Sequence, residues 1–99
     1  MWKVVALLGL MGTPAVAQTD QDVEFCTGYG TLAADIMTHR QNGTPISTIL
    51  AVINEDETEA KAMVMEAFGG PQFQSPSGKQ RAVDNFRNDI ELRCLQSRI

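Results

Sequence analysis

The spacing of apolar residues predicts helices along most of the chain. Apolar positions recur three or four residues apart rather than every second residue, which is the period of a helix with one buried face. We expect the first helix to begin near Thr19 or Asp20 and to stop at Asn42-Gly43, a pair typical of helix ends. Its apolar face also carries Gly30, which predicts that another helix approaches closely there. The apolar residues of this face are Phe25, Cys26, Tyr29, Ala33, Ile36 and Met37.

Two shorter apolar stripes follow in the middle of the chain. Thr44-Pro45 fits an N-cap followed by proline at the first helical position, and the polar stretch 54–59 has the composition of another helix start. The pattern leaves open whether Asn54 breaks the helix or only bends it. A Gly-Gly-Pro sequence at 69–71 ends the region. The two stripes consist of Ile46, Ile49, Leu50 and Ile53, and then of Ala60, Met63, Val64, Ala67 and Phe68.

The last predicted helix starts at Ser75-Pro76 or at Ser77, within a segment at 71–78 that otherwise reads as the one long loop. Asp89 and Arg93 are four residues apart in the order that favours an ion pair on a helix surface. The apolar face of this helix consists of Val83, Phe86, Ile90 and Cys94.

The two cysteines lie near opposite ends of the predicted helical region. If the chain enters an oxidising compartment, a disulfide between Cys26 and Cys94 is the simplest use of its two cysteines. Closing a loop of about 69 residues would stabilise the fold by at most about 4.4 kcal/mol in the chain-entropy model. A redox-active pair and an intermolecular bridge are the alternatives, although the chain has no Cys-x-x-Cys sequence.

This disulfide constrains the number of helices. If each helix runs antiparallel to the one before it, the start of the first helix meets the end of the last only when the number of helices is even. We therefore break the middle region near Asn54 and predict an all-α fold, a small disulfide-stapled bundle of four helices with a short second helix. A three-helix fold could bring Cys26 and Cys94 together only if the loop at 69–75 crossed the domain, and the length of this loop just allows that.

The first 17 residues have the features of an export signal. Lys3 precedes a short apolar run, and Ala15-Val16-Ala17 provides the small residues typical of a cleavage site before Gln18. The run is too short to span a bilayer, which needs about 20 apolar residues, although a retained membrane anchor is the alternative. We therefore predict a signal peptide at 1–17 and a single helical domain at 18–99, located in the periplasm or secreted.

Charge narrows the range of partners. The formal net charge is −4, and removal of residues 1–17 would make it more negative because Lys3 leaves with them. Nucleic acids and anionic lipids select basic surfaces, so we expect no nucleic-acid partner and no stable membrane insertion after signal cleavage. Basic residues concentrate in the last helix, which we expect to pack beside the more acidic earlier helices.

Few side chains are suited to catalysis or metal binding. His39 follows Asp35 by four residues. At this spacing the two side chains could form an ion pair on the helix surface or a pair that responds to pH. The acidic run at 55–59 lacks the glycine and ligand spacing of a calcium loop. One histidine and two bonded cysteines are too few ligands for zinc. We expect no metal site, no cofactor and no enzymatic activity.

Four side chains are candidates for an interaction surface. Arg40 falls within the apolar stripe of the first helix, where it could clamp a carboxylate of a ligand, extend to solvent, bond the carbonyls of a helix end or pair with the acidic run. Met65, Leu92 and Leu95 lie off the core stripes. They are either ordinary exposed apolar residues or parts of a hydrophobic patch for a partner or for self-association.

Two sets of residues resemble known groups of proteins. The spaced pattern of Cys26, the 40–45 sequence Arg-Gln-Asn-Gly-Thr-Pro, Glu66-Ala67-Phe68 with Pro71, Phe86 and Cys94 resembles small exported proteobacterial and phage-associated helical proteins of unknown function. Phe25-Cys26-Thr27-Gly28-Tyr29 resembles the opening of the Rap1a/Tai immunity proteins, which are all-helical periplasmic inhibitors. The size, single disulfide and helical character are also similar to those of the HdeA acid-stress chaperones.

These resemblances imply a function without catalysis. We expect a periplasmic or secreted interaction protein, an inhibitor or immunity-like factor whose partner is another periplasmic protein. The alternative is an acid-stress periplasmic chaperone of the HdeA type. The oligomeric state does not follow from the sequence.

Overall fold

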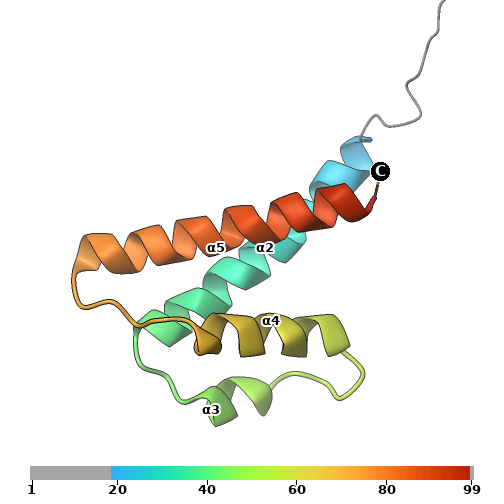
Figure 1. Cartoon of the computed structure of the whole chain (residues 1–99). Helices are drawn as coiled ribbons and strands as arrows, with labels where there is room; N and C mark the ends of the chain where they lie inside the picture. The colour runs from blue at the N-terminus through green and yellow to red at the C-terminus, as the bar shows by residue number, and fades with distance from the viewer. Residues whose placement is uncertain (1–18, 99) are drawn as a thin grey trace, which may run out of the picture.

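Four helices make up most of the chain that the structure describes. The computed structural model describes residues 19–98, so the predicted signal peptide at 1–17 lies outside the described residues. The described part contains no strand, and none of its helices has the length and apolar character needed to cross a membrane. The prediction of an all-α fold with four helices and a short second one is confirmed. The helices are α2 (Asp20–Gln41), α3 (Ile46–Leu50), α4 (Thr58–Gly69) and α5 (Pro76–Ser97) (Figure 1).

The ends of α2 are fixed by local chemistry. The Thr19 hydroxyl accepts the N–H of Asp22 at 3.0 Å, and the Asp22 carboxylate accepts the N–H of Thr19 at 3.3 Å. This capping box satisfies donors that a helix start otherwise leaves unpaired. Asn42 is the C-cap, and Gly43 follows with φ 81°, in the left-handed region that favours glycine. The predicted start at Thr19 and stop at Asn42-Gly43 are both confirmed.

The start of α3 differs from the prediction. Pro45, with an extended ψ of 140°, is the N-cap, so the helix begins at Ile46 and the prediction of Thr44 as N-cap is wrong. The hydroxyl of Thr44 lies instead 3.1 Å from Nδ1 of His39. At the other end of α3, Asn54 breaks the helix rather than bending it. Its N–H donates to the Glu57 carboxylate at 2.9 Å and its carbonyl accepts the Glu57 N–H at 3.1 Å, which closes a turn before α4.

The last helix begins as predicted, at the earlier of the two alternatives. The Ser75 hydroxyl accepts the N–H of Gly78 at 3.0 Å, and Pro76 occupies the first helical position. Residues 76–78 are therefore the first turn of α5. The loop before it is shorter than the predicted 71–78 segment.

The long helices α2 and α5 run antiparallel and are joined near both ends. The predicted disulfide between Cys26 and Cys94 is present, with the two Cα atoms 5.5 Å apart. One turn beyond it, Nε of Arg98 lies 2.5 Å from Oδ1 of Asp22. At the far end, the Lys79 ammonium group donates to the main-chain carbonyl of Gln41. The disulfide and the Arg98–Asp22 pair thus join the start of α2 to the end of α5.

Helix α4 runs parallel to α2. The hydroxyl of Tyr29, which lies near the middle of α2, donates to the Glu59 carboxylate at the start of α4, and Arg40 donates to the carbonyl of Gly70 where both helices end. Both pairs join residues about thirty positions apart in the chain. A parallel neighbour requires the chain to travel back between the two helices, and α3 with the turn after it forms this return segment (Figure 1). The even number of helices inferred from the cysteines is thus confirmed.

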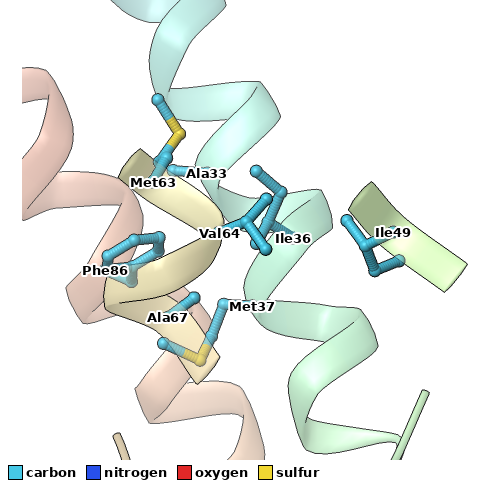
Figure 2. Close-up of a cluster of buried hydrophobic side chains, with 8 residues drawn as sticks. All are labelled: Ala33, Ile36, Met37, Ile49, Met63, Val64, Ala67 and Phe86. Atoms are coloured by element: carbon cyan, nitrogen blue, oxygen red, sulfur yellow. The ribbon is translucent and has the colours of Figure 1, made fainter. Parts of the chain in front are cut away.

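The core lies between α2 and α4 and is closed by one residue from each remaining helix. Figure 2 shows Val64 of α4 beside Ile36 of α2, with Phe86 of α5 and Ile49 of α3 on opposite sides of them. Each stripe predicted from the sequence contributes to this cluster. Its buried members are Ala33, Ile36, Met37, Ile49, Met63, Val64, Ala67 and Phe86.

Phe25 is a correction to the predicted core. It belongs to the apolar face of α2, yet 48% of it is exposed. Phe25 is exposed because of its position along the axis of α2. Helix α4 begins opposite Tyr29, and Phe25 lies one helical turn before that point. No residue of α4 is therefore positioned to cover it.

Gly28 and Gly30 of α2 have different surroundings. A Cβ on Gly30 would overlap the Glu91 side chain of α5, whose Cδ would be 2.6 Å away, so the predicted close approach is confirmed. A Cβ on Gly28 would meet nothing within 4 Å. The close approach at Gly30 is made by a side chain of the neighbouring helix.

Candidate functional site

A groove opens where the start of α2, the start of α4 and the end of α5 meet. Its volume is about 350 Å³. Apolar side chains from all three helices line it beside the disulfide, and polar groups lie among them. We call it the disulfide groove, and it is lined by Phe25, Tyr29, Glu59, Met63, Ile90, Arg93, Cys94, Ser97 and Arg98.

Arg98 anchors the end of α5 over the groove. Its Nε donates to Oδ1 of Asp22, and its guanidinium carbon lies 4.4 Å from the centre of the Phe25 ring. A cation over an aromatic face at this distance is attractive by about 0.5–1 kcal/mol at an exposed site. The hydrogen bond from Arg98, followed by that from the Thr19 N–H, holds the pKa of Asp22 below its ordinary value. Phe25 is thus covered partly by a charged group rather than by the core.

Tyr29 connects α2 to α4 at the groove. Its hydroxyl donates to Oε1 of Glu59 at 2.7 Å, and its ring meets that of Phe25 edge to face, with centres 5.0 Å apart. The hydrogen bond to the Glu59 carboxylate, with a smaller effect of burial, raises the pKa of Tyr29 because both favour the neutral phenol. The aromatic pair and the carboxylate therefore form one wall of the groove.

Arg93 connects α5 to α4. One of its terminal nitrogens, Nη2, lies 2.7 Å from the Glu66 carboxylate and 2.9 Å from that of Asp89, which confirms the predicted Asp89–Arg93 pair. The bond to Glu66 is the main cause of a raised pKa of Arg93. These groups are about half exposed, so each pair contributes only about 0.2–1 kcal/mol. With Arg98, this contact agrees with the predicted packing of a basic last helix beside more acidic ones.

Arg40 lies outside the groove. Its Nε and Nη2 donate to the carbonyl of Gly70 at 3.2 and 2.8 Å, and its guanidinium group lies 5.8 Å from the centre of the Phe68 ring. It therefore bonds the end of α4, which is one of the structural alternatives that the sequence left open. These contacts direct at least two of its donors to the protein itself.

The three apolar candidates differ in exposure. Met65 and Leu92 are 60% and 53% exposed, while Leu95 is partly buried. Met65 lies about 140° around α4 from the buried Ala60, and Leu92 about 160° around α5 from Cys94. Met65 and Leu92 therefore each point away from the inward side of their own helix. Leu92 and Leu95, three residues apart on α5, are neighbours on one surface.

His39 and the acidic run at 55–59 both make local contacts. His39 is exposed and its Nδ1 contacts the Thr44 hydroxyl, rather than forming the predicted ion pair with Asp35. In the acidic run, Glu57 is used to close the turn with Asn54. Among residues 19–98, no three or more His, Cys, Asp or Glu side chains are grouped so that they could hold a metal ion.

Sequence reasoning missed Gln41, the one polar side chain of the described residues that is buried. Only 2% of it is exposed. Its amide nitrogen donates to the carbonyl of Pro71 at 3.0 Å, and its amide oxygen accepts the N–H of Phe73 at 2.8 Å. The signal was available, because Gln41 continues the buried face of α2 four residues after Met37. A polar residue on a core stripe indicates a buried hydrogen-bonding role.

The site that the geometry supports is therefore the disulfide groove, whose walls are about equally apolar and polar. Its chemistry suits binding, since the one carboxylate among its lining residues is already bonded to Tyr29. No known protein family, curated protein or solved structure matches this chain.

Proposed function

We propose that this chain is an exported, non-enzymatic interaction protein of the inhibitor or immunity-factor kind. In this proposal it binds another periplasmic protein through the disulfide groove. The observation that carries the proposal is that Phe25, Met63 and Ile90, from three different helices, line one groove of about 350 Å³. The volume of the groove is within the range of ligand-binding sites, and its apolar side chains lie among polar groups that could orient a ligand.

The occupant we propose is a bulky apolar side chain of the partner. Burying one such side chain contributes about 1.5–3 kcal/mol. The main chain of the partner segment would then meet Arg93, Ser97 and Arg98, which supply hydrogen-bonding groups along the groove. Because a rigid site loses little entropy on binding, a fixed groove favours affinity.

The disulfide and the interhelical contacts supply that rigidity. The Cys26–Cys94 bond, the Arg98–Asp22 pair and the Tyr29–Glu59 hydrogen bond all lie at this end of the molecule. Two features support the proposed export of the protein. A disulfide suits an oxidising compartment, and the 1–17 sequence has the pattern of a signal peptide.

The test compares three substitutions that each place a charge on a different surface. Phe25→Glu alters the groove, Leu92→Glu the outer face of α5, and Met65→Glu the outer face of α4. Tagged wild type is used to capture partners from oxidised periplasm of the source organism, and each captured protein is then purified and titrated against all four forms. We expect direct binding of a defined partner that Phe25→Glu weakens at least about tenfold and the other two leave unchanged.

Two results would contradict this proposal. The first is the absence of any direct, saturable partner of the wild-type protein. The second is a partner that Phe25→Glu binds normally and Leu92→Glu or Met65→Glu does not, which would move the interaction to an outer face. Circular dichroism of each variant checks that the helices remain formed.

An acid-stress chaperone is the second candidate, and one observation favours it. Each pair of long helices is joined near the groove by a contact that needs a carboxylate: Asp22 with Arg98, Glu59 with Tyr29, and Glu66 with Arg93. The hydrogen bond from Arg98 lowers the pKa of Asp22, so protonation of Asp22 in acid weakens this contact and would loosen the last turn of α5 from α2. The test is suppression of client aggregation at acid pH. Failure to protect any client there, with an unchanged fold, removes this candidate.

A further inference from the structure

The two sulfur-bearing residues of the disulfide are exposed to different extents. Cys26 is 1% exposed and does not line the groove. Cys94 is partly exposed and lies among the groove residues. A thiolate can exchange only with a sulfur that it reaches, so access decides which of the two sulfurs is attacked.

We propose that the disulfide groove is a thiol-exchange site and that Cys94 is its point of entry. The reacting partner is a thiol, either a small molecule or a cysteine on a protein segment lying in the groove. Its thiolate attacks Sγ of Cys94, forming a mixed disulfide as the Cys26–Cys94 bond breaks. The electron pair of that bond leaves with Cys26, whose thiolate takes a proton from water because burial favours the neutral thiol. No net oxidant is consumed, since the partner thiol is oxidised as Cys26 is reduced.

Local charge does not select the point of attack. The two guanidinium groups that line the groove, Arg93 and Arg98, are already paired, Arg93 with Glu66 and Asp89 and Arg98 with Asp22. The difference in exposure between Cys94 and Cys26 therefore decides which sulfur is attacked.

Exchange at Cys94 would change the same groove that contains it. With the bond open, the last turn of α5 would be tied to its neighbours by exposed contacts such as Arg93 with Glu66 and Arg98 with Asp22. Exposed pairs of this kind are weak, so the walls of the groove would lose rigidity. The inference does not depend on the proposed function, because exchange needs no bound partner.

The experiment maps the mixed disulfide that reduced glutathione forms with the native oxidised protein. The reaction is stopped early with acid, free thiols are blocked with N-ethylmaleimide, and tryptic peptides are identified by mass spectrometry. Trypsin separates the cysteines, since Arg40 follows Cys26 and Arg93 precedes Cys94. We expect glutathione on Cys94 and N-ethylmaleimide on Cys26, in excess of the reverse pattern by about tenfold. In concentrated urea the preference should disappear.

A matched pair of substitutions tests the route of access. Ser97 lines the groove and Gln96 does not, and both are exposed. Ser97→Trp should slow the formation of the Cys94 adduct several-fold, whereas Gln96→Trp should leave it unchanged. Preferential adduct formation on Cys26, an equal distribution in the native protein, or identical rates for the two variants would each overturn the proposal. The urea midpoint of each variant shows whether the fold is intact.

Discussion

The side-chain oxygen of the buried residue Gln41 accepts the main-chain N–H of Phe73 at 2.8 Å, and the two residues are 32 positions apart in the chain. The same side chain donates to the carbonyl of Pro71, so one buried amide serves two main-chain groups of the loop between α4 and α5. A loop without regular structure must find partners for its buried polar groups elsewhere. Gln41 supplies them at the end of α2.

Replacing this amide should cost stability. Gln41→Leu keeps the approximate volume but leaves the Phe73 N–H and the Pro71 carbonyl without their partner. We expect a loss of about 2–3 kcal/mol in the free energy of unfolding, measured by urea denaturation. Gln80→Leu is the control, because Gln80 is exposed and bonds only the Asp84 side chain of the same helix. Equal stability of the two variants would show that the buried bonds contribute little.

The two glycines of α2 should respond oppositely to alanine. Gly28→Ala places a methyl group in open space and removes the helix penalty of glycine, so we expect a gain of up to about 1 kcal/mol. Gly30→Ala gains the same propensity but meets the Glu91 side chain, so we expect a net loss. Glu91→Ala in the Gly30→Ala background should restore stability. Thermal and urea unfolding measure all three, and stabilisation by Gly30→Ala alone would refute the close contact.

The pair of Asp22 and Arg98 should make stability depend on pH in acid. The pKa of Asp22 is lowered in the folded state, so its contribution is complete above the ordinary value of 3.8 and is lost as the pH falls below that through the lowered folded value. Arg98→Gln should move the pKa of Asp22 upward, though the Thr19 N–H still favours the charged form. Carboxyl-carbon NMR titration measures this. Arg87→Gln, which affects a pair within α5, should leave Asp22 unchanged.

Tyr29 should titrate at unusually high pH. It is the only tyrosine, so the ultraviolet absorbance of tyrosinate reports on it alone. Its hydrogen bond to Glu59 raises its pKa, and the associated stability is present below the ordinary value of 10.0 and lost as the pH rises through the folded value. Glu59→Gln should lower the midpoint. A midpoint that does not respond to Glu59→Gln would indicate that the bond is absent in solution.

Much of the fold could be predicted because its causes are local. The period of apolar residues defined the faces of the helices, and capping chemistry at Thr19, Asn42-Gly43 and Ser75 placed their ends. Two cysteines near the ends of the helical region then gave both the disulfide and the even number of helices. Gly30 on an apolar face indicated the close contact with α5.

The candidate site could not be predicted in the same way, because it depends on where helices end relative to one another. Tyr29 and Phe25 belong to one stripe of the sequence, yet Tyr29 meets the start of α4 and Phe25 lies a turn beyond it. The sequence by itself determined the helices, their buried faces and the disulfide, since these follow from neighbours a few residues apart and from two reactive side chains. Only the tertiary structure decided the groove and the buried role of Gln41, because both arise from the longitudinal offset of segments some thirty or more residues apart in the chain.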